Sequence, residues 1–196
     1  MGDNRDRINY KEIYLLILSL LQGSLFFVLI DNVNIFKKKV DVYTISFYIL
    51  ACIIFFRIFQ SQMLAALKYD EKWDFKALDF VVVFIFAMFE YYLFDFIGRT
   101  ANLQKIYLFI IVFALMGAVG FWYTLKSLKK KYQPRERELQ ILNIAITLLI
   151  AIIAVVGYLI DCYTLHIVVN VIIVLVLSLN IYISFCMSGL TKNRRN

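Results

Sequence analysis

The sequence is poor in the residues that build catalytic sites and loops. It has one histidine, one proline, three cysteines and seven glycines among 196 residues. It contains no HExxH metal motif, no glycine-rich phosphate loop and no GxSxG nucleophile motif. Cys52, Cys162 and Cys186 lie far apart and form no CxxC redox motif. We therefore expect a protein that is not an enzyme and that uses no metal and no cofactor.

Long hydrophobic runs make up most of the chain. Hydrophobic residues account for 62% of it and the mean hydropathy is +0.76, values far too apolar for a soluble domain. Apolar and polar residues do not alternate, which excludes an outer-membrane barrel. Six windows are long enough to cross a bilayer as helices: 13–30, 42–63, 78–97, 106–125, 139–160 and 165–187. We predict an all-α integral membrane protein, with residues 1–196 forming one bundle of six transmembrane helices and short tails.

The basic residues are spread unevenly between the two sides of this predicted bundle. Of 21 Lys and Arg residues, 15 lie in the two tails and in the second and fourth loops. The positive-inside rule then places both termini in the cytoplasm, most simply of a bacterial inner membrane. The basic triplet 37–39 is the exception, because this topology puts it outside.

Glu90 interrupts the third window, which reads FVVVFIFAMFEYYLFDFI over 80–97. The apolar part before it has ten residues, and at about 1.5 Å per residue such a helix covers about half of the ~30 Å hydrocarbon core. Glu90 is therefore expected near mid-membrane, where a charged group costs about 3 kcal/mol. It must be protonated, paired or beside a wet cavity, which makes it a candidate functional residue.

Arg57 is the basic residue best placed to pair with Glu90. Their windows are joined by the short polar segment 68–76, which predicts an antiparallel hairpin. With Lys72 at the tip, the two residues differ in height by about 5 Å. Such a pair would fix the helix register, and loss of one member would strand the other. Two other arrangements stay open, because Arg57 could snorkel to the head groups or pair across subunits.

Other polar residues inside the windows are expected to face neighbouring helices. Asn143 and Asn180 lie at nearly the same distance from the tight turn 161–164, which predicts a hydrogen bond between them, with a polar lining for a solute path as the alternative. His166 is interpreted as an interfacial residue rather than a proton relay. The full set of expected interhelical polar contacts is Gln22, Asn143, Thr147, Asn170 and Asn180.

The segment 126–138 is the most polar part of the chain and contains the only proline. Pro134 suits the first turn of a helix, where its missing N–H would be unpaired anyway. Basic residues here indicate contact with anionic lipids, or a docking site for a cytosolic partner, and only weakly nucleic acid. The residues expected to dock are Lys129, Lys130, Lys131, Arg135 and Arg137.

Two functions fit this sequence. The first is an interaction subunit that forms a homo-oligomer, contacts membrane lipids and recruits a cytosolic protein. Small membrane proteins of similar composition are common among phage-defence and bacteriocin-immunity components. The second is a homo-oligomeric channel or a small-solute transporter with Glu90 and Arg57 at its constriction. We favour the first, because no window is polar enough to form a continuous wet wall, and we expect no direct binding of nucleic acid.

Overall fold

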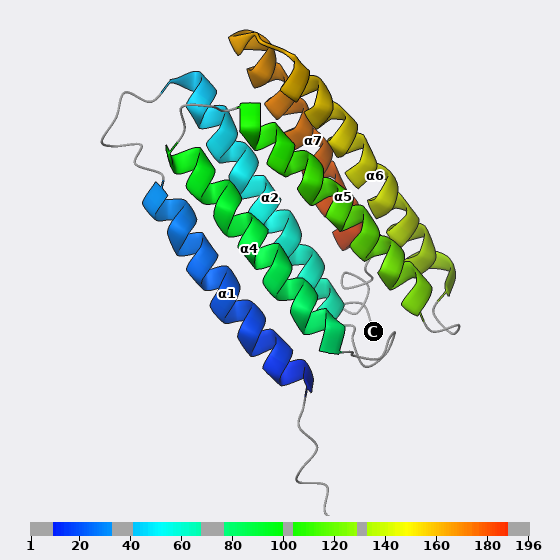
Figure 1. The fold of residues 1–196 in the computed structure, drawn as a ribbon. Helices are drawn as coiled ribbons and strands as arrows, with labels where there is room; N and C mark the ends of the chain where they lie inside the picture. Colours follow the sequence, from blue (N-terminus) through cyan, green and yellow to red (C-terminus); the bar gives the residue numbers. More distant parts are fainter. Residues whose placement is uncertain (1–9, 33–40, 68–76, 100–103, 129–132, 188–196) are drawn as a thin grey trace, which may run out of the picture.

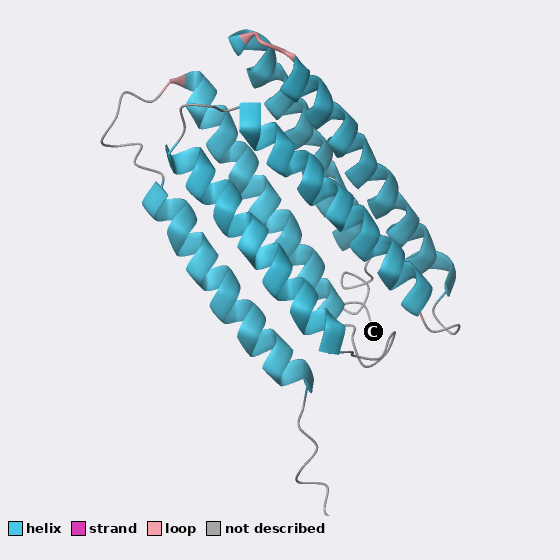
Figure 2. Ribbon diagram, in the orientation of Figure 1, coloured by secondary structure: helices cyan, strands magenta, loops and turns pink. Residues whose placement is uncertain are grey.

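The structure is a computed structural model and describes residues 10–32, 41–67, 77–99, 104–128 and 133–187. Figure 2 shows helices and a few short loop segments, with no strand among the described residues. The helices are α1 (Tyr10–Asn32), α2 (Val42–Leu67), α4 (Ala77–Arg99), α5 (Gln104–Ser127), α6 (Gln133–Leu159) and α7 (Tyr163–Met187). All six are long and apolar enough to span a membrane. The all-α class and the six predicted windows are thus confirmed.

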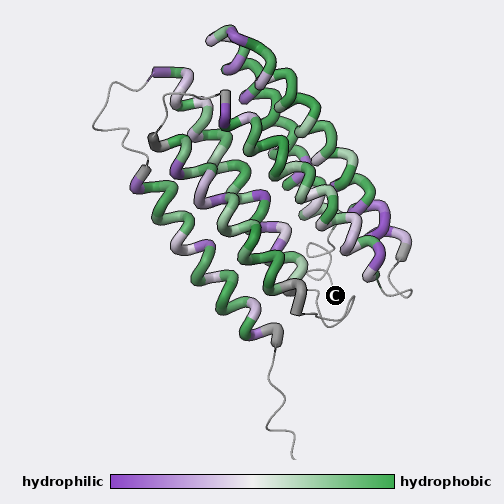
Figure 3. Tube along the Cα trace, viewed as in Figure 1, coloured by the Kyte–Doolittle hydropathy of each residue, from purple (hydrophilic) through white to green (hydrophobic). Residues whose placement is uncertain are grey.

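The helices are apolar around most of their circumference. Figure 3 shows hydrophobic residues along the middle of every helix and hydrophilic ones mainly toward the ends. Large side chains point outward, including Phe27 at 70% exposure and Leu159 at 74%. In water such a surface would be strongly unfavourable, whereas lipid chains solvate it well. The outer surface therefore indicates a membrane protein.

Consecutive helices run antiparallel, so the described chain begins and ends at the same end of the bundle (Figure 1). We call this the terminal end. It holds the last turns of α2 and α5 and the first turns of α4 and α6. The opposite end holds the start of α2 and the turn between α6 and α7.

The six helices form a closed ring of neighbours in the order α1, α4, α5, α6, α7, α2. The most extensive packing is that of α5 on α6, followed by α2 on α7 and α1 on α4. Helix α2 also contacts α4 across the ring, and half of its spanning window is buried, a larger share than in any other helix. Helix α2 is therefore the element on which the two sides of the bundle are assembled.

Local sequence explains where α2 and α6 begin. Asp41 precedes α2 and its Oδ1 accepts a hydrogen bond from the backbone N–H of Thr44 at 2.8 Å, as a helix N-cap does. Hydrogen bonds from the Thr44 side chain and backbone hold the pKa of the Asp41 carboxyl below its usual value. Pro134 lies in the first turn of α6, as predicted, and Glu136 follows in the same turn. Helix α6 thus starts with a polar segment before its apolar part.

Large aromatic side chains from α2, α4 and α5 lie in the core of the bundle. Phe47, Phe94 and Tyr107 are completely buried and belong to one large cluster. Gly157 on α6 lets the ring of Tyr107 lie against the backbone, since a Cβ there would come within 2.6 Å of Tyr107 Cε1. This close approach allows α5 and α6 to pack as the tightest pair in the bundle.

Candidate functional site

Glu90 on α4 is completely buried and hydrogen-bonded to Gln22, which also bonds to Gln62. Gln22 of α1 donates through Nε2 to Glu90 Oε2 at 3.0 Å and to Gln62 Oε1 of α2 at 3.4 Å. All three side chains are buried, and we call them the Glu90 cluster. The cluster joins α1, α2 and α4 by polar contacts in the middle of an apolar interior.

The hydrogen-bonding capacity of this cluster fits a protonated Glu90. Glu90 Oε1 and Gln22 Oε1 are both buried and have no hydrogen-bond partner among the described residues. An ionised carboxylate would leave two acceptors without a donor. A neutral carboxyl has one O–H that can donate to an acceptor such as Gln22 Oε1, whereas an ionised one has none. The arrangement therefore favours a neutral acid, which also avoids a charge in the membrane.

Arg57 on α2 is the centre of a second group, the Arg57 cluster, formed with Gln60, Asn143 and Asn180. Its Nη1 donates to Gln60 Oε1 at 3.2 Å and its Nη2 to Asn143 Oδ1 at 2.9 Å. Asn180 Nδ2 donates to the same Asn143 oxygen at 3.1 Å. Arg57 Cζ also lies 5.4 Å from the ring centre of Phe121 on α5. Arg57 thus links α2 to α5 and α6.

The contacts around Asn143 tie the last hairpin to α2. Asn143 and Asn180, which the sequence places at one height, are in direct contact. Gln60 Nε2 donates to the backbone oxygen of Ile181 on α7 at 2.9 Å. Thr147, in contrast, donates to the carbonyls of Asn143 and Ile144 within its own helix. Asn143 is therefore a shared acceptor for two helices, and Thr147 makes no interhelical hydrogen bond.

A third polar group lies toward the opposite end of the bundle. Asn170 Nδ2 donates to Ser46 Oγ at 2.8 Å, and Tyr107 O–H donates to Asn170 Oδ1 at 2.9 Å. We call these three residues the Asn170 cluster. His166 is buried beside it, with its ring stacked on Tyr107 at 5.4 Å between centroids. The predicted interhelical residue Asn170 is thus satisfied by α2 and α5.

The structure does not bring Arg57 and Glu90 together. Their hydrogen-bond partners come from different helices, α6 for Arg57 and α1 for Glu90. The physical reason is the direction in which each side chain leaves its helix. Arg57 and Gln62, which joins the Glu90 cluster, are five residues apart on α2 and so differ by about 140° around its axis. The predicted pairing rested on the heights of Arg57 and Glu90 along the hairpin. Heights do not determine the direction in which a side chain points around its helix axis.

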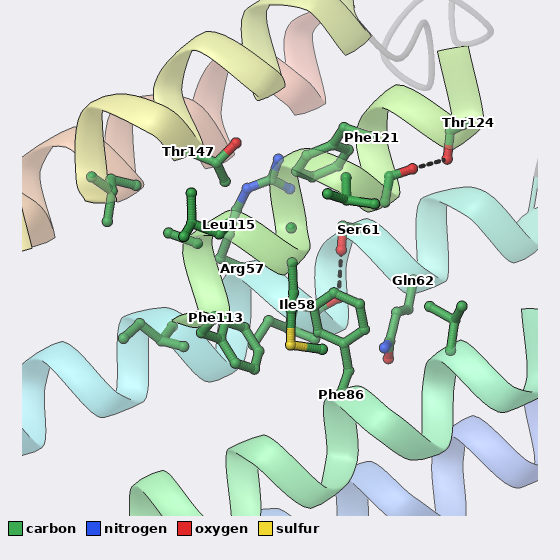
Figure 4. Close-up of a pocket in the computed structure, with 18 of the residues that line it drawn as sticks. Arg57, Ile58, Ser61, Gln62, Phe86, Phe113, Leu115, Phe121, Thr124 and Thr147 are labelled. Atoms are coloured by element: carbon green, nitrogen blue, oxygen red, sulfur yellow. Dashed lines mark hydrogen bonds between the residues drawn. The ribbon is translucent and has the colours of Figure 1, made fainter. Parts of the chain in front are cut away.

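A cavity of about 700 Å³ lies among α2, α4, α5 and α6 (Figure 4). Ile58 of α2, Phe86 of α4 and Phe113 of α5 line it, and the two phenylalanine rings contact each other edge-on with their centroids 5.2 Å apart. Figure 4 shows Arg57 reaching from α2 toward Phe121, with Thr147 of α6 nearby. The wall is otherwise almost entirely apolar, so Arg57 is the charged group at this cavity among the described residues.

A second, smaller crevice of about 70 Å³ shares Arg57 with the large cavity. It is lined by Ser61 of α2, Thr124 of α5, and Glu136 and Gln140 from the first turns of α6. These residues lead from Arg57 toward the terminal end. Arg57 thus lies where an apolar cavity meets a polar crevice.

The predicted docking residues at the start of α6 are only partly described. Lys129, Lys130 and Lys131 lie outside the described residues. Arg135 is exposed and donates from Nη2 to the backbone oxygen of Cys186 at 3.0 Å, which ties α6 to the end of α7. Arg137 is exposed on the next turn. Both arginines face outward at the terminal end, as a docking surface requires.

No group of three or more His, Cys, Asp or Glu side chains that could hold a metal ion occurs in the described part of the chain. The three cysteines are free thiols. The candidate site therefore consists of buried hydrogen bonds and a cavity. Comparisons with models of protein families, with curated proteins and with solved structures find no match.

Sequence reasoning missed Gln60, Gln62 and Tyr107 as members of these clusters. Gln60 lies three residues after Arg57, a spacing that places both on one face of a helix. That spacing was a usable signal. Gln62 lies on the face of α2 opposite to Arg57. The sequence does not show that this face meets α1 and α4, because that depends on how the helices pack. Tyr107 offered no signal, because a tyrosine near a helix end is more often an interfacial residue.

Proposed function

We propose that this protein is a non-enzymatic, multi-pass subunit of a bacterial inner membrane that oligomerises and recruits a cytosolic protein. Both termini lie in the cytoplasm in this proposal, because most Lys and Arg residues belong to the segments at the terminal end. The terminal end is then the surface that a cytosolic partner meets.

One observation carries the proposal: the buried polar side chains hydrogen-bond to one another across helices in three separate clusters. The Glu90, Arg57 and Asn170 clusters each join three or more helices. Polar groups that conduct an ion would instead follow one another along a water-filled path. Polar contacts confined to helix interfaces favour a subunit whose membrane part is a rigid assembly, rather than a pore with Glu90 and Arg57 at its constriction.

Orientation is tested with two natural cysteines at opposite ends of the bundle. Cys162 lies in the turn between α6 and α7 and Cys186 near the terminal end, and both are exposed. A membrane-impermeant maleimide added to cells with a permeabilised outer membrane should label Cys162 and spare Cys186. Labelling of Cys186 with Cys162 protected would reverse the proposed topology.

Recruitment is tested with a variant and a matched control. Lys129, Lys130, Lys131 and Arg137 are changed to Gln in one variant, and residues 37–39 in the other. Arg135 is left intact because it holds α7. Full-length tagged protein is purified after mild cross-linking in its own cells, and co-purifying soluble proteins are quantified. We expect the first variant to lose a protein that the wild type and the control retain, because the triplet 37–39 precedes α2 at the opposite end. Equal recovery with both variants would contradict the proposed docking surface.

The oligomeric state is measured separately. Native mass spectrometry of the full chain in a mild detergent should give masses of several copies. A monomer at every concentration would remove oligomerisation from the proposal while leaving recruitment untouched.

A further inference from the structure

The cavity between α4 and α5 follows from how the helices are paired. Helix α5 packs mainly against α6, and α4 packs mainly against α1. Between these two pairs, side chains of α2, α4, α5 and α6 line a space of about 700 Å³. That volume lies within the range of about 300–1,000 Å³ found for small-molecule sites. The cavity is therefore large enough for a ligand.

The cavity reaches the outer, lipid-facing surface of the bundle. Leu115, Val119 and Trp122 of α5 line it and are also exposed, Val119 at 63%. In a membrane these exposed side chains contact hydrocarbon chains. A hydrophobic molecule could thus enter sideways from the bilayer, without passing through water.

Arg57 gives this apolar cavity one cationic group. Its partners among the described residues are the amide oxygens of Gln60 and Asn143 and the ring of Phe121, none of which is a carboxylate. A guanidinium has five N–H donors, so groups remain for a further acceptor. Glu136 lines the adjoining crevice together with Arg57. The hydrogen bonds of Arg57 among the described residues go to neutral groups only.

The crevice beside Arg57 holds further polar groups that lack partners. Gln140 is 7% exposed and Ser184 is 1% exposed, and both line the crevice. Gln140 Oε1 and Ser184 Oγ have no hydrogen bond among the described residues. Buried polar groups are normally paired. The Ser184 hydroxyl can donate to an acceptor that enters the crevice, whereas Gln140 Oε1 needs a donor.

We propose that this site binds an amphiphile with a single hydrocarbon chain and an anionic carboxylate or phosphate head. The chain lies in the apolar cavity, along the wall that includes the contacting rings of Phe86 and Phe113, and the head pairs with the Arg57 guanidinium at the entrance to the crevice. Planar guanidinium groups pair with either type of head through two parallel hydrogen bonds. The site is separate from the docking surface of the proposed function, so either can hold without the other.

Binding is measured with tritiated oleate on the full-length protein in a neutral maltoside detergent, by scintillation proximity. We expect saturable binding that unlabelled oleate displaces and that uncharged monoolein does not. Lysophosphatidic acid is the competitor with a phosphate head. If it displaces tritiated oleate more strongly than unlabelled oleate does, the natural ligand is a phospholipid. If it displaces oleate more weakly, the natural ligand is a fatty-acid anion. Absence of saturable oleate binding, or equal displacement by monoolein, would overturn the proposal.

Two variants test the two halves of the site. Arg57→Gln should weaken oleate binding by at least about tenfold, because a charge-assisted pair is lost. Ala114→Phe fills the cavity from α5, where Ala114 is buried and lines the wall, and should abolish saturable binding. Ala145→Phe is the matched control on an exposed position of α6 and should bind as the wild type does.

Each variant is first shown to be monodisperse by size-exclusion chromatography. If Arg57→Gln does not fold, the comparison of Ala114→Phe with Ala145→Phe decides the location of the site. Unchanged binding in folded Arg57→Gln, or in Ala114→Phe, would overturn the assignment.

Discussion

Glu90 and Arg57 are ionisable groups inside the same bundle, but their surroundings differ. Glu90 is fully buried and bonded to Gln22, which also bonds to Gln62, and a neutral carboxyl leaves fewer unpaired acceptors in the Glu90 cluster than an ionised one. Arg57 donates two hydrogen bonds, to Gln60 and Asn143, and its side chain also lines a cavity. An enclosed, self-satisfied group stabilises helix packing, whereas a group left with open donors beside a cavity is suited to binding.

The largest expected effect comes from placing a permanent charge in the enclosed cluster. Glu90→Lys introduces an ammonium with no anion nearby, which should cost about 3–5 kcal/mol of stability. We expect loss of the monodisperse peak in fluorescence-detected size-exclusion chromatography. Arg57→Lys is the control, because it keeps a cation beside the cavity and should leave the peak in place.

Exchanging the two charges sharpens the same contrast. Because the two residues have different partners, Glu90→Arg combined with Arg57→Glu should be no more stable than the worse single variant. Partial recovery in the double variant would show that the side chains do attract each other directly.

Removing the carboxyl without adding a charge should have a smaller effect. Glu90→Leu removes the stronger acceptor of the Gln22 amide, at about 1–3 kcal/mol. Gln22→Leu should lower the stability less in the Glu90→Leu background than in the wild type, because the Gln22 amide has already lost Glu90 as an acceptor. Unfolding midpoints in mixed micelles measure this cycle, and strictly additive losses would mean that Gln22 and Glu90 do not interact.

The Arg57 cluster should depend more on one asparagine than on the other. Asn143 accepts from both Arg57 and Asn180, whereas Asn180 makes a single contact with it. The loss of stability caused by Asn143→Leu should therefore exceed the roughly 0.6–2 kcal/mol expected for Asn180→Leu. The double variant should be close to Asn143→Leu alone. If the same micelle titration ranks Asn180→Leu as the more damaging change, the shared-acceptor geometry is wrong.

The smallest expected effect is that of Glu90→Gln. The new amide can donate to Gln22 Oε1 and accept from Gln22 Nε2, as the neutral acid does. We expect the free energy of unfolding, obtained from the unfolding midpoint, to change by less than about 1 kcal/mol, well under the change for Glu90→Leu. A loss as large as that of Glu90→Leu would show that an ionised carboxylate is needed.

Most of the fold could be predicted from the sequence, because hydrophobic runs of sufficient length fix the number and limits of membrane-spanning helices. The contact of Asn143 with Asn180 was also predictable, since a four-residue turn fixes the height of both residues. The direction of Arg57 was not predictable, because it depends on which helices surround α2. The cavity likewise results from the pairing of α4 with α1 and of α5 with α6, which leaves no local pattern in the sequence.

The most direct test of the central contrast is chemical access to the two positions. Cys52, Cys162 and Cys186 are first replaced by Ala, and Arg57→Cys and Glu90→Cys are then made separately in this background. Small, neutral methyl methanethiosulfonate is added to the folded protein and its reaction is followed by intact mass. The account predicts rapid modification of Arg57→Cys, slowed by oleate, and no modification of Glu90→Cys until the protein is unfolded. Equal rates at the two positions would contradict it.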